Sequence, residues 1–150
     1  MRASSNPSDV LVTYSLGSCI GLALYDPVAR VGGLIHCMLP LSTIDPLRAE
    51  ESPAMFTDTG VPALIQAVLD LGADKTRLSV KVAGAAHLLD DRNTFRIGER
   101  NKMVLRKVLW RNSLFITAVD TGGTIARTMS LRLDNGLTSI RTGGKQYDLL

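Results

Sequence analysis

Apolar runs bounded by turn residues predict strands in both the first and the last third of the chain. We expect strands over residues 10–15, 19–25, 32–39, 78–83, 114–120, 125–133 and 137–140. Apolar residues recur at helical spacing over 54–71 and 99–110, and Pro62 is expected to kink the first helix or to start its second part. This order of elements predicts a mixed sheet with helices packed on it, an α/β (α+β) fold.

Turn signals and polar segments separate these elements. Asp26-Pro27 and Asp134-Asn135-Gly136 are typical of turns, the second of a tight hairpin. Nothing in the chain resembles a long linker or an internal repeat, so we expect a single domain over 1–150. Its two ends, 1–9 and 142–150, are polar and are expected to be loosely ordered.

The composition narrows the class of protein. The chain has 150 residues, 45% hydrophobic and 21% charged, which suits one globular domain and excludes disorder for most of its length. A net charge of +3 with scattered basic residues, together with one Trp, three Tyr and three Phe, excludes a nucleic-acid-binding surface.

No apolar run reaches the roughly 18 residues of a spanning helix. Because the first nine residues also lack the apolar core of a secretory signal, we expect a cytoplasmic protein without membrane insertion, and a monomer.

Two cysteines and two histidines are the candidate chemical groups. Cys19 and Cys37 cannot form a disulfide scaffold and are expected to be free thiols. Their spacing to His36 and His87 matches no zinc motif, so we expect neither a metal nor a cofactor. Strand alternation directs Cys37 away from the face of His36 and into the core, and His87 is expected at the surface.

A hairpin brings Cys19 and His36 together. If the turn is symmetric about Pro27 and Val28, the two residues lie directly opposite each other, with Cβ atoms about 5 Å apart. A register shift of two would leave them diagonal on one face, whereas a shift of one would place them on opposite faces.

A thiol beside an imidazole is a nucleophile beside a base. A neighbouring imidazolium lowers a cysteine pKa, and the same imidazole can protonate a leaving amine. Gly17 and Ser18 permit a tight bend whose backbone N–H groups would form an oxyanion hole, and the Thr13 hydroxyl would orient His36. The alternatives are an inert buried cysteine and a threonine chosen only for its β-propensity.

The chain resembles the CheD family, the chemoreceptor glutamine deamidases of bacterial and archaeal chemotaxis. The residues that carry the resemblance are Thr13–Ile20, Leu24–Pro27, Gly32–Pro40, Lys81–Ala86, Ile97–Asn101 and Asp120–Gly123 with Arg127. These motifs follow the family's order, and the resemblance as a whole covers about residues 10 to 141.

The resemblance implies an α/β/α sandwich with a mixed, largely antiparallel sheet, similar to the catalytic domain of cytotoxic necrotizing factor. It also implies a catalytic triad on Cys19, His36 and Thr13. The activity would convert receptor glutamines to glutamates through a cysteine thioester, and the partners would be chemoreceptor helices and a CheC-type phosphatase. A module that mainly binds CheC or a receptor, and a different thiol hydrolase, remain the alternatives.

Two departures from the family pattern and two side chains leave open questions. The family commonly has glycine where this chain has Ala85 and Ala126, and an alanine would be strained at either position if its φ is positive. Asn101 is expected to stabilise the end of a helix, with a substrate contact as the alternative. Arg127 would bind either a receptor carboxylate or a surface acid.

Overall fold

The computed structural model describes residues 1–87 and 96–150. The polar loop expected before the second helix falls largely outside these residues. Nine strands in the described part form two sheets, in the orders β1-β4-β3-β5-β6 and β2-β7-β8-β9. No helix among the described residues has both the length and the apolar character needed to cross a membrane.

The first sheet is built around a hairpin whose central strand is buried on both faces. β3 (Ile20–Asp26) pairs antiparallel with β4 (Val31–Cys37) and with β5 (Ser79–Gly84). β6 (Ala118–Thr121) pairs parallel with β5, and β1 (Arg2–Ser4) pairs antiparallel with β4. Every residue of β3 is buried, which explains why its sequence is a continuous apolar run.

The second sheet is antiparallel and amphipathic. It contains β2 (Val10–Leu16), β7 (Arg127–Arg132), β8 (Thr138–Thr142) and β9 (Lys145–Asp148). Its inward side chains form a core with one face of the first sheet; they include Leu11, Met129, Leu131 and Ile140. Polar residues alternate with these along β7 and β8, as expected for a sheet that packs on one face only.

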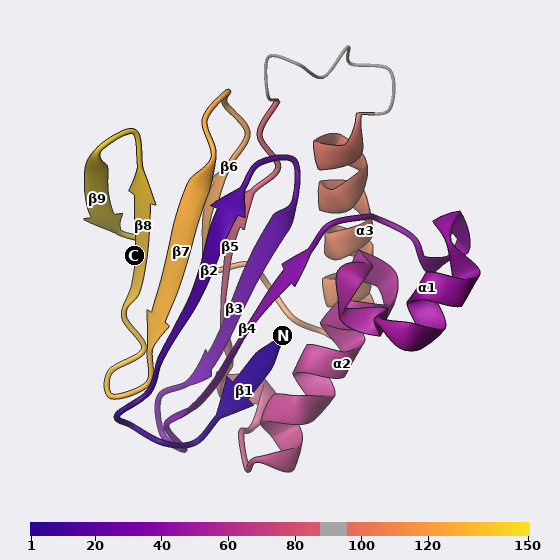
Figure 1. Ribbon diagram of the computed structural model, residues 1–150. Helices are drawn as coiled ribbons and strands as arrows, with labels where there is room; N and C mark the ends of the chain where they lie inside the picture. The colour runs from indigo at the N-terminus through magenta and orange to yellow at the C-terminus, as the bar shows by residue number, and fades with distance from the viewer. Residues whose placement is uncertain (88–95) are drawn as a thin grey trace.

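The helices cover the other face of the first sheet. α2 (Thr57–Asp70) and α3 (Ile97–Arg111) share a core with β3, β4 and β5, while the short α1 (Pro46–Glu51) lies in the segment between β4 and α2 (Figure 1). The α+β class is therefore confirmed. The layers of the described residues run helix, sheet, sheet, where the resemblance implied α/β/α. The sequence predicted one sheet that contains all the strands, but β2, β7, β8 and β9 form a second sheet. The apolar face of this second sheet covers the first sheet on the side where an α/β/α sandwich has its second helix layer.

Several boundaries differ from the sequence prediction. Residues Pro53–Met55 form a separate 3-10 turn, so the helix α2 begins later than the sequence predicted. Pro62 lies inside α2, which continues through it without a second start. Both ends of the chain, expected to be loosely ordered, contain strands. β1 pairs with the edge of the first sheet, and β9 pairs with β8. β1 and β9 are short segments of three and four residues, and hydrophobic periodicity does not reveal strands of this length.

Candidate active site

The hairpin register places Cys19 and His36 diagonally on one face. His36 pairs with Gly21, so Cys19, which immediately precedes β3, is offset from it by two residues. The even-numbered Leu34 of β4 packs in the core between the sheets, whereas Cys37 packs on the helix side. His36 therefore faces the second sheet, and Cys19 packs at the margin of that same core. The shared face is confirmed, and direct opposition of the two residues is wrong.

The turn explains the shift in register. Asp26 pairs with Val31, which leaves a four-residue loop that is centred one residue later than the sequence suggested. The Asp26 carboxylate accepts hydrogen bonds from the backbone N–H groups of Val28 and Ala29, and Arg30 adopts a positive φ of 53°. The side chain of Asp26 thereby selects a longer turn than the Asp-Pro signal alone indicated.

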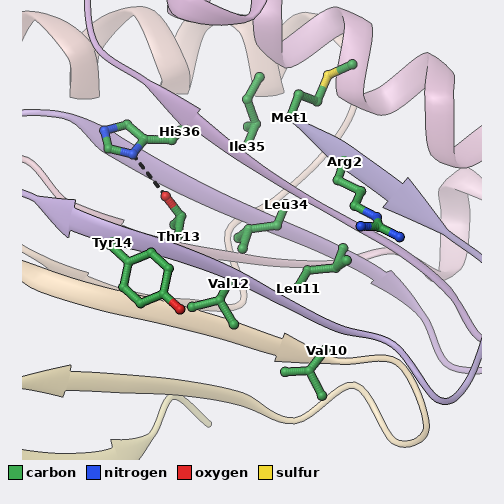
Figure 2. Close-up of a pocket in the computed structure, with 10 residues that line it drawn as sticks. All are labelled: Met1, Arg2, Val10, Leu11, Val12, Thr13, Tyr14, Leu34, Ile35 and His36. Carbon is green, nitrogen blue, oxygen red and sulfur yellow. Dashed lines mark hydrogen bonds between the residues drawn. The ribbon is translucent and has the colours of Figure 1, made fainter.

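His36 is oriented from the second sheet. The Oγ1 atom of Thr13, on β2, lies 2.9 Å from Nδ1 of His36, and this bond crosses from one sheet to the other (Figure 2). When Nδ1 carries the proton and donates it to Thr13, Nε2 is left as the acceptor. The ring would then present a base on the side away from Thr13. Both residues also line an open hollow of about 450 Å³ between β2 and β4.

The electrostatics favour a neutral pair at rest. Burial raises the pKa of the Cys19 thiol and lowers the pKa of His36. Both shifts favour a thiol and an imidazole over a thiolate and an imidazolium. The direction is opposite to the lowered cysteine pKa expected from the sequence. A nucleophilic attack from this state would transfer the thiol proton to His36 as the new bond forms.

The bend that carries Cys19 is held by its carbonyl groups. The Gly17 carbonyl accepts a hydrogen bond from the Ala86 N–H at 2.8 Å, and the Cys19 carbonyl accepts one from the Ala85 N–H at 2.7 Å. Between them, the Ser18 carbonyl accepts one from Nδ2 of Asn101 at 3.2 Å. Within 1–87 and 96–150, the Ser18 and Cys19 N–H groups donate no hydrogen bond to another residue. The predicted bend at Gly17 and Ser18 is present. The Gly17 N–H, however, donates to the Ser15 carbonyl at 2.9 Å, so it is not available as an oxyanion donor, and the candidate donors beside the thiol are the N–H groups of Ser18 and Cys19.

Close backbone packing behind the bend explains the glycine segment after β5. Gly84 has a φ of +105°, and a Cβ there would collide with the Cys19 carbonyl oxygen. Ala85 follows with a φ of 50°, so the strain expected for an alanine in this position is present. Ala126 is absent from the described residues with positive φ, so its methyl group causes no such strain.

Other residues singled out in the sequence have structural partners. Arg127 forms a two-pronged ion pair with Asp120, with both N–O distances 3.0 Å, and therefore supports the turn between β6 and β7. Nε2 of His87 lies 3.4 Å from Oε1 of Glu99, and the His87 side chain is half exposed. Burial raises the pKa of Cys37 to about 12, as fits an inert core thiol. Among the residues described, no cluster of three His, Cys, Asp or Glu side chains could hold a metal ion.

Asn101 does not stabilise the end of α3, so the role that the sequence predicted for it is wrong; its side chain bonds to other segments of the chain. It is fully buried on α3 and contacts the segments on both sides of the candidate site, Ser18 before the cysteine and Met38 after the histidine. Its partners are 83 and 63 residues away in the chain, so no local pattern identifies them. The only sequence signal was its position at the end of Ile97–Asn101, a motif shared with the resembling family.

A half-buried thiol, an imidazole hydrogen-bonded to a hydroxyl, and two backbone N–H groups that donate to no other described residue fit a hydrolase with a cysteine nucleophile. The comparisons with known proteins agree with this class. The family model described as CheD chemotactic sensory transduction matches residues 38–142. The chain belongs to the CheD family.

Individual relatives align over nearly the whole chain. The probable chemoreceptor glutamine deamidase CheD 1 of Syntrophus aciditrophicus is 49% identical over 143 residues, which are 95% of this chain and 89% of that protein. A probable chemoreceptor glutamine deamidase CheD of Solibacter usitatus is 46% identical over 99% of this chain and 88% of its own. One from Pyrococcus horikoshii is 40% identical over 91% and 85%.

Proposed function

We propose that this protein deamidates glutamine side chains of chemoreceptors, with Cys19 as nucleophile, His36 as acid and base, and Thr13 as the group that orients His36. The observation that carries the proposal is the 2.9 Å contact between Thr13 and His36 on the face shared with Cys19. The names of the relatives supply the substrate class, because all three are probable chemoreceptor glutamine deamidases.

The first half of the reaction forms a thioester. Sγ of Cys19 attacks the side-chain amide carbon of the glutamine while its proton passes to Nε2 of His36. The amide oxygen becomes an oxyanion that accepts hydrogen bonds from the N–H groups of Ser18 and Cys19. The carbon–nitrogen bond then breaks, His36 returns the proton to the nitrogen, and ammonia leaves.

The second half hydrolyses the thioester. A water molecule attacks the thioester carbon while His36 accepts one of its protons, and the same two N–H groups stabilise the second oxyanion. The carbon–sulfur bond breaks, the proton returns to the sulfur of Cys19, and the product is glutamate. His36 carries every proton transfer, so the sequence of steps requires no metal or cofactor.

The setting of the reaction follows from the same family resemblance. We place the protein in the cytoplasm as a monomer. We also propose that residues 1–150 form one domain, because both hydrophobic cores share the first sheet. We also propose a CheC-type phosphatase as a partner. A module that mainly binds CheC or a receptor, and another thiol hydrolase, make different predictions for the test below.

The test is incubation of chemoreceptor cytoplasmic fragments with this protein, followed by intact and peptide mass spectrometry. We expect the mass gain of an amide converted to an acid at defined glutamines, and none in fragments incubated without the protein. Cleaved fragments would instead identify a peptidase. Unchanged fragments that co-elute with the folded protein would refute the deamidase and support the binding module.

A further inference from the structure

Asn101 uses its whole amide group inside the protein. Its side chain is fully buried, and Nδ2 lies 3.2 Å from the Ser18 carbonyl and 3.2 Å from the Met38 carbonyl. Oγ1 of Thr57 lies 3.0 Å from Oδ1 and 3.2 Å from the Leu39 carbonyl oxygen, so its single proton is shared between these two acceptors. Two carbonyl partners require two N–H donors, so the chemistry of the partners fixes which end of the amide is nitrogen.

The position of Asn101 on α3 depends on close packing behind the nucleophile bend. Gly98, one turn earlier on α3, lies against the Ala85 backbone, where an added Cβ would come within 3.0 Å of the Ala85 carbonyl oxygen. Ala85 itself donates to the Cys19 carbonyl. The helix, the end of β5 and the bend therefore contact one another directly, and Asn101 supplies the contact to the Ser18–Cys19 peptide.

Peptide planarity converts this contact into an orientation of the active site. In a trans peptide the C=O and N–H groups point in opposite directions, and the Ser18–Cys19 peptide is trans. Because Asn101 holds the Ser18 carbonyl toward α3, the Cys19 N–H points away from α3. The Ala86 N–H holds the Gly17 carbonyl in the same manner and thereby directs the Ser18 N–H. Within 1–87 and 96–150, neither N–H group donates a hydrogen bond to another residue.

We infer that Asn101 is the positioning residue of the oxyanion hole: by holding the Ser18 carbonyl, it directs the Cys19 N–H at the oxygen that becomes negative during attack. This inference rests on the proposed deamidase reaction. Its contact with the Met38 carbonyl ties the same unit to the end of β4, two residues beyond His36. The donor and the base then keep a fixed spacing through the reaction.

The test compares Asn101→Ala with a matched variant of the same network. Thr57→Val preserves the size of its side chain and removes the hydroxyl that donates to Oδ1, but it leaves both carbonyl contacts of Asn101 in place. For each folded variant, two rates are measured: deamidation of a chemoreceptor fragment, and alkylation of Cys19 by iodoacetamide, read from the Cys19 peptide. Alkylation needs the thiol but no oxyanion hole, so it separates the two roles.

Loss of a direct oxyanion donor lowers kcat by about 100- to 1,000-fold, and Asn101 acts one bond away from such a donor. For Asn101→Ala we expect kcat to fall by about 10- to 100-fold, with KM and the alkylation rate within about threefold of wild type. Thr57→Val is expected to keep kcat within about threefold. If Asn101→Ala fails to fold, Asn101→Ser keeps a neutral polar side chain whose hydroxyl supplies at most one donor, and it is expected to lower kcat in the same direction.

Two results would overturn the inference: an unchanged kcat in a folded Asn101 variant, or an alkylation rate that falls in parallel with kcat. The second result would show that Asn101 maintains the thiol and not the oxyanion donors. Wild-type protein without deamidase activity would be a failure of the proposed function, and it is recognised before any variant is compared.

Discussion

The contact between Thr13 and His36 leads to the sharpest single prediction. Thr13→Val has nearly the same shape and a better strand propensity but lacks the Oγ1 atom that lies 2.9 Å from Nδ1. A neutral hydrogen bond of this kind contributes about 1 kcal/mol, which is roughly a fivefold effect on a rate. Without Oγ1 the ring is also free to carry its proton on Nε2, where it cannot accept the thiol proton. Partners that orient metal-binding histidines typically account for about 10- to 100-fold, and we apply the same range to this histidine.

We therefore expect Thr13→Val to lower kcat for deamidation by about 10- to 100-fold while KM stays within about threefold. Because Thr13 is only half buried, the free energy of unfolding should change by less than about 1 kcal/mol. Thr13→Ser is the control, since it keeps the hydroxyl, and it should retain most of the activity. A folded Thr13→Val with a kcat within twofold of wild type would show that Thr13 is only a strand residue and would refute its orienting role.

Three further predictions concern stability and pH. Ser113 is an exposed residue with a φ of 57° at the C-terminus of α3, where the Leu114 N–H donates to the Leu109 carbonyl. Because glycine adopts a positive φ without strain, Ser113→Gly should stabilise the fold by about 1 kcal/mol and raise Tm. The hydrogen bonds from Arg77 lower the pKa of the fully buried Asp26 below 3.8, so this stabilisation is present above that pH and is lost as the pH falls toward the lowered pKa. In urea unfolding at pH 7, Asp26→Asn should lower the free energy of unfolding by about 2 to 3 kcal/mol, a value reduced because Arg77 is partly exposed, and this loss should shrink in acid. The control is Asp134→Asn, which breaks the exposed ion pair with Arg132. An equal loss in that control would contradict the prediction. The pKa of His36 is lowered from 6.5 and that of Cys19 is raised from 9.0, so kcat/KM should stay high between pH 6.5 and pH 9.0 and fall below pH 6.5 and above pH 9.0. A fall of kcat/KM on the acid side that begins above pH 6.5 would contradict the neutral resting pair.

Local chemistry in the sequence was enough to predict part of the site. Alternation along two strands joined by a turn placed Cys19 and His36 on one face and Cys37 on the other, and this result survives a register shift of two. The shift itself arises from the Asp26 carboxylate, which caps the turn and also binds Arg77, 51 residues away. A turn signal read from neighbouring residues cannot include such a distant partner.

The layer order and the positioning residues were beyond a local reading. Strand periodicity shows that Leu11 and Met129 have a buried face, but not that this face packs on a second sheet in place of helices. The role of Asn101 depends on carbonyl groups that meet only in the folded chain. The family comparison identified Ala85 and Ala126 as positions where a positive φ would cause strain, and only Ala85 has one.

The most direct test of the account is the initial rate of glutamate formation in a chemoreceptor fragment by wild type, Cys19→Ala and Cys37→Ala, each measured by peptide mass spectrometry. Each variant removes one thiol group, and the two thiols lie on opposite faces of the first sheet. The account predicts no enzymatic conversion with Cys19→Ala and a rate close to wild type with folded Cys37→Ala. Conversion by a folded Cys19→Ala at the wild-type rate would contradict the assignment of Cys19 as the nucleophile.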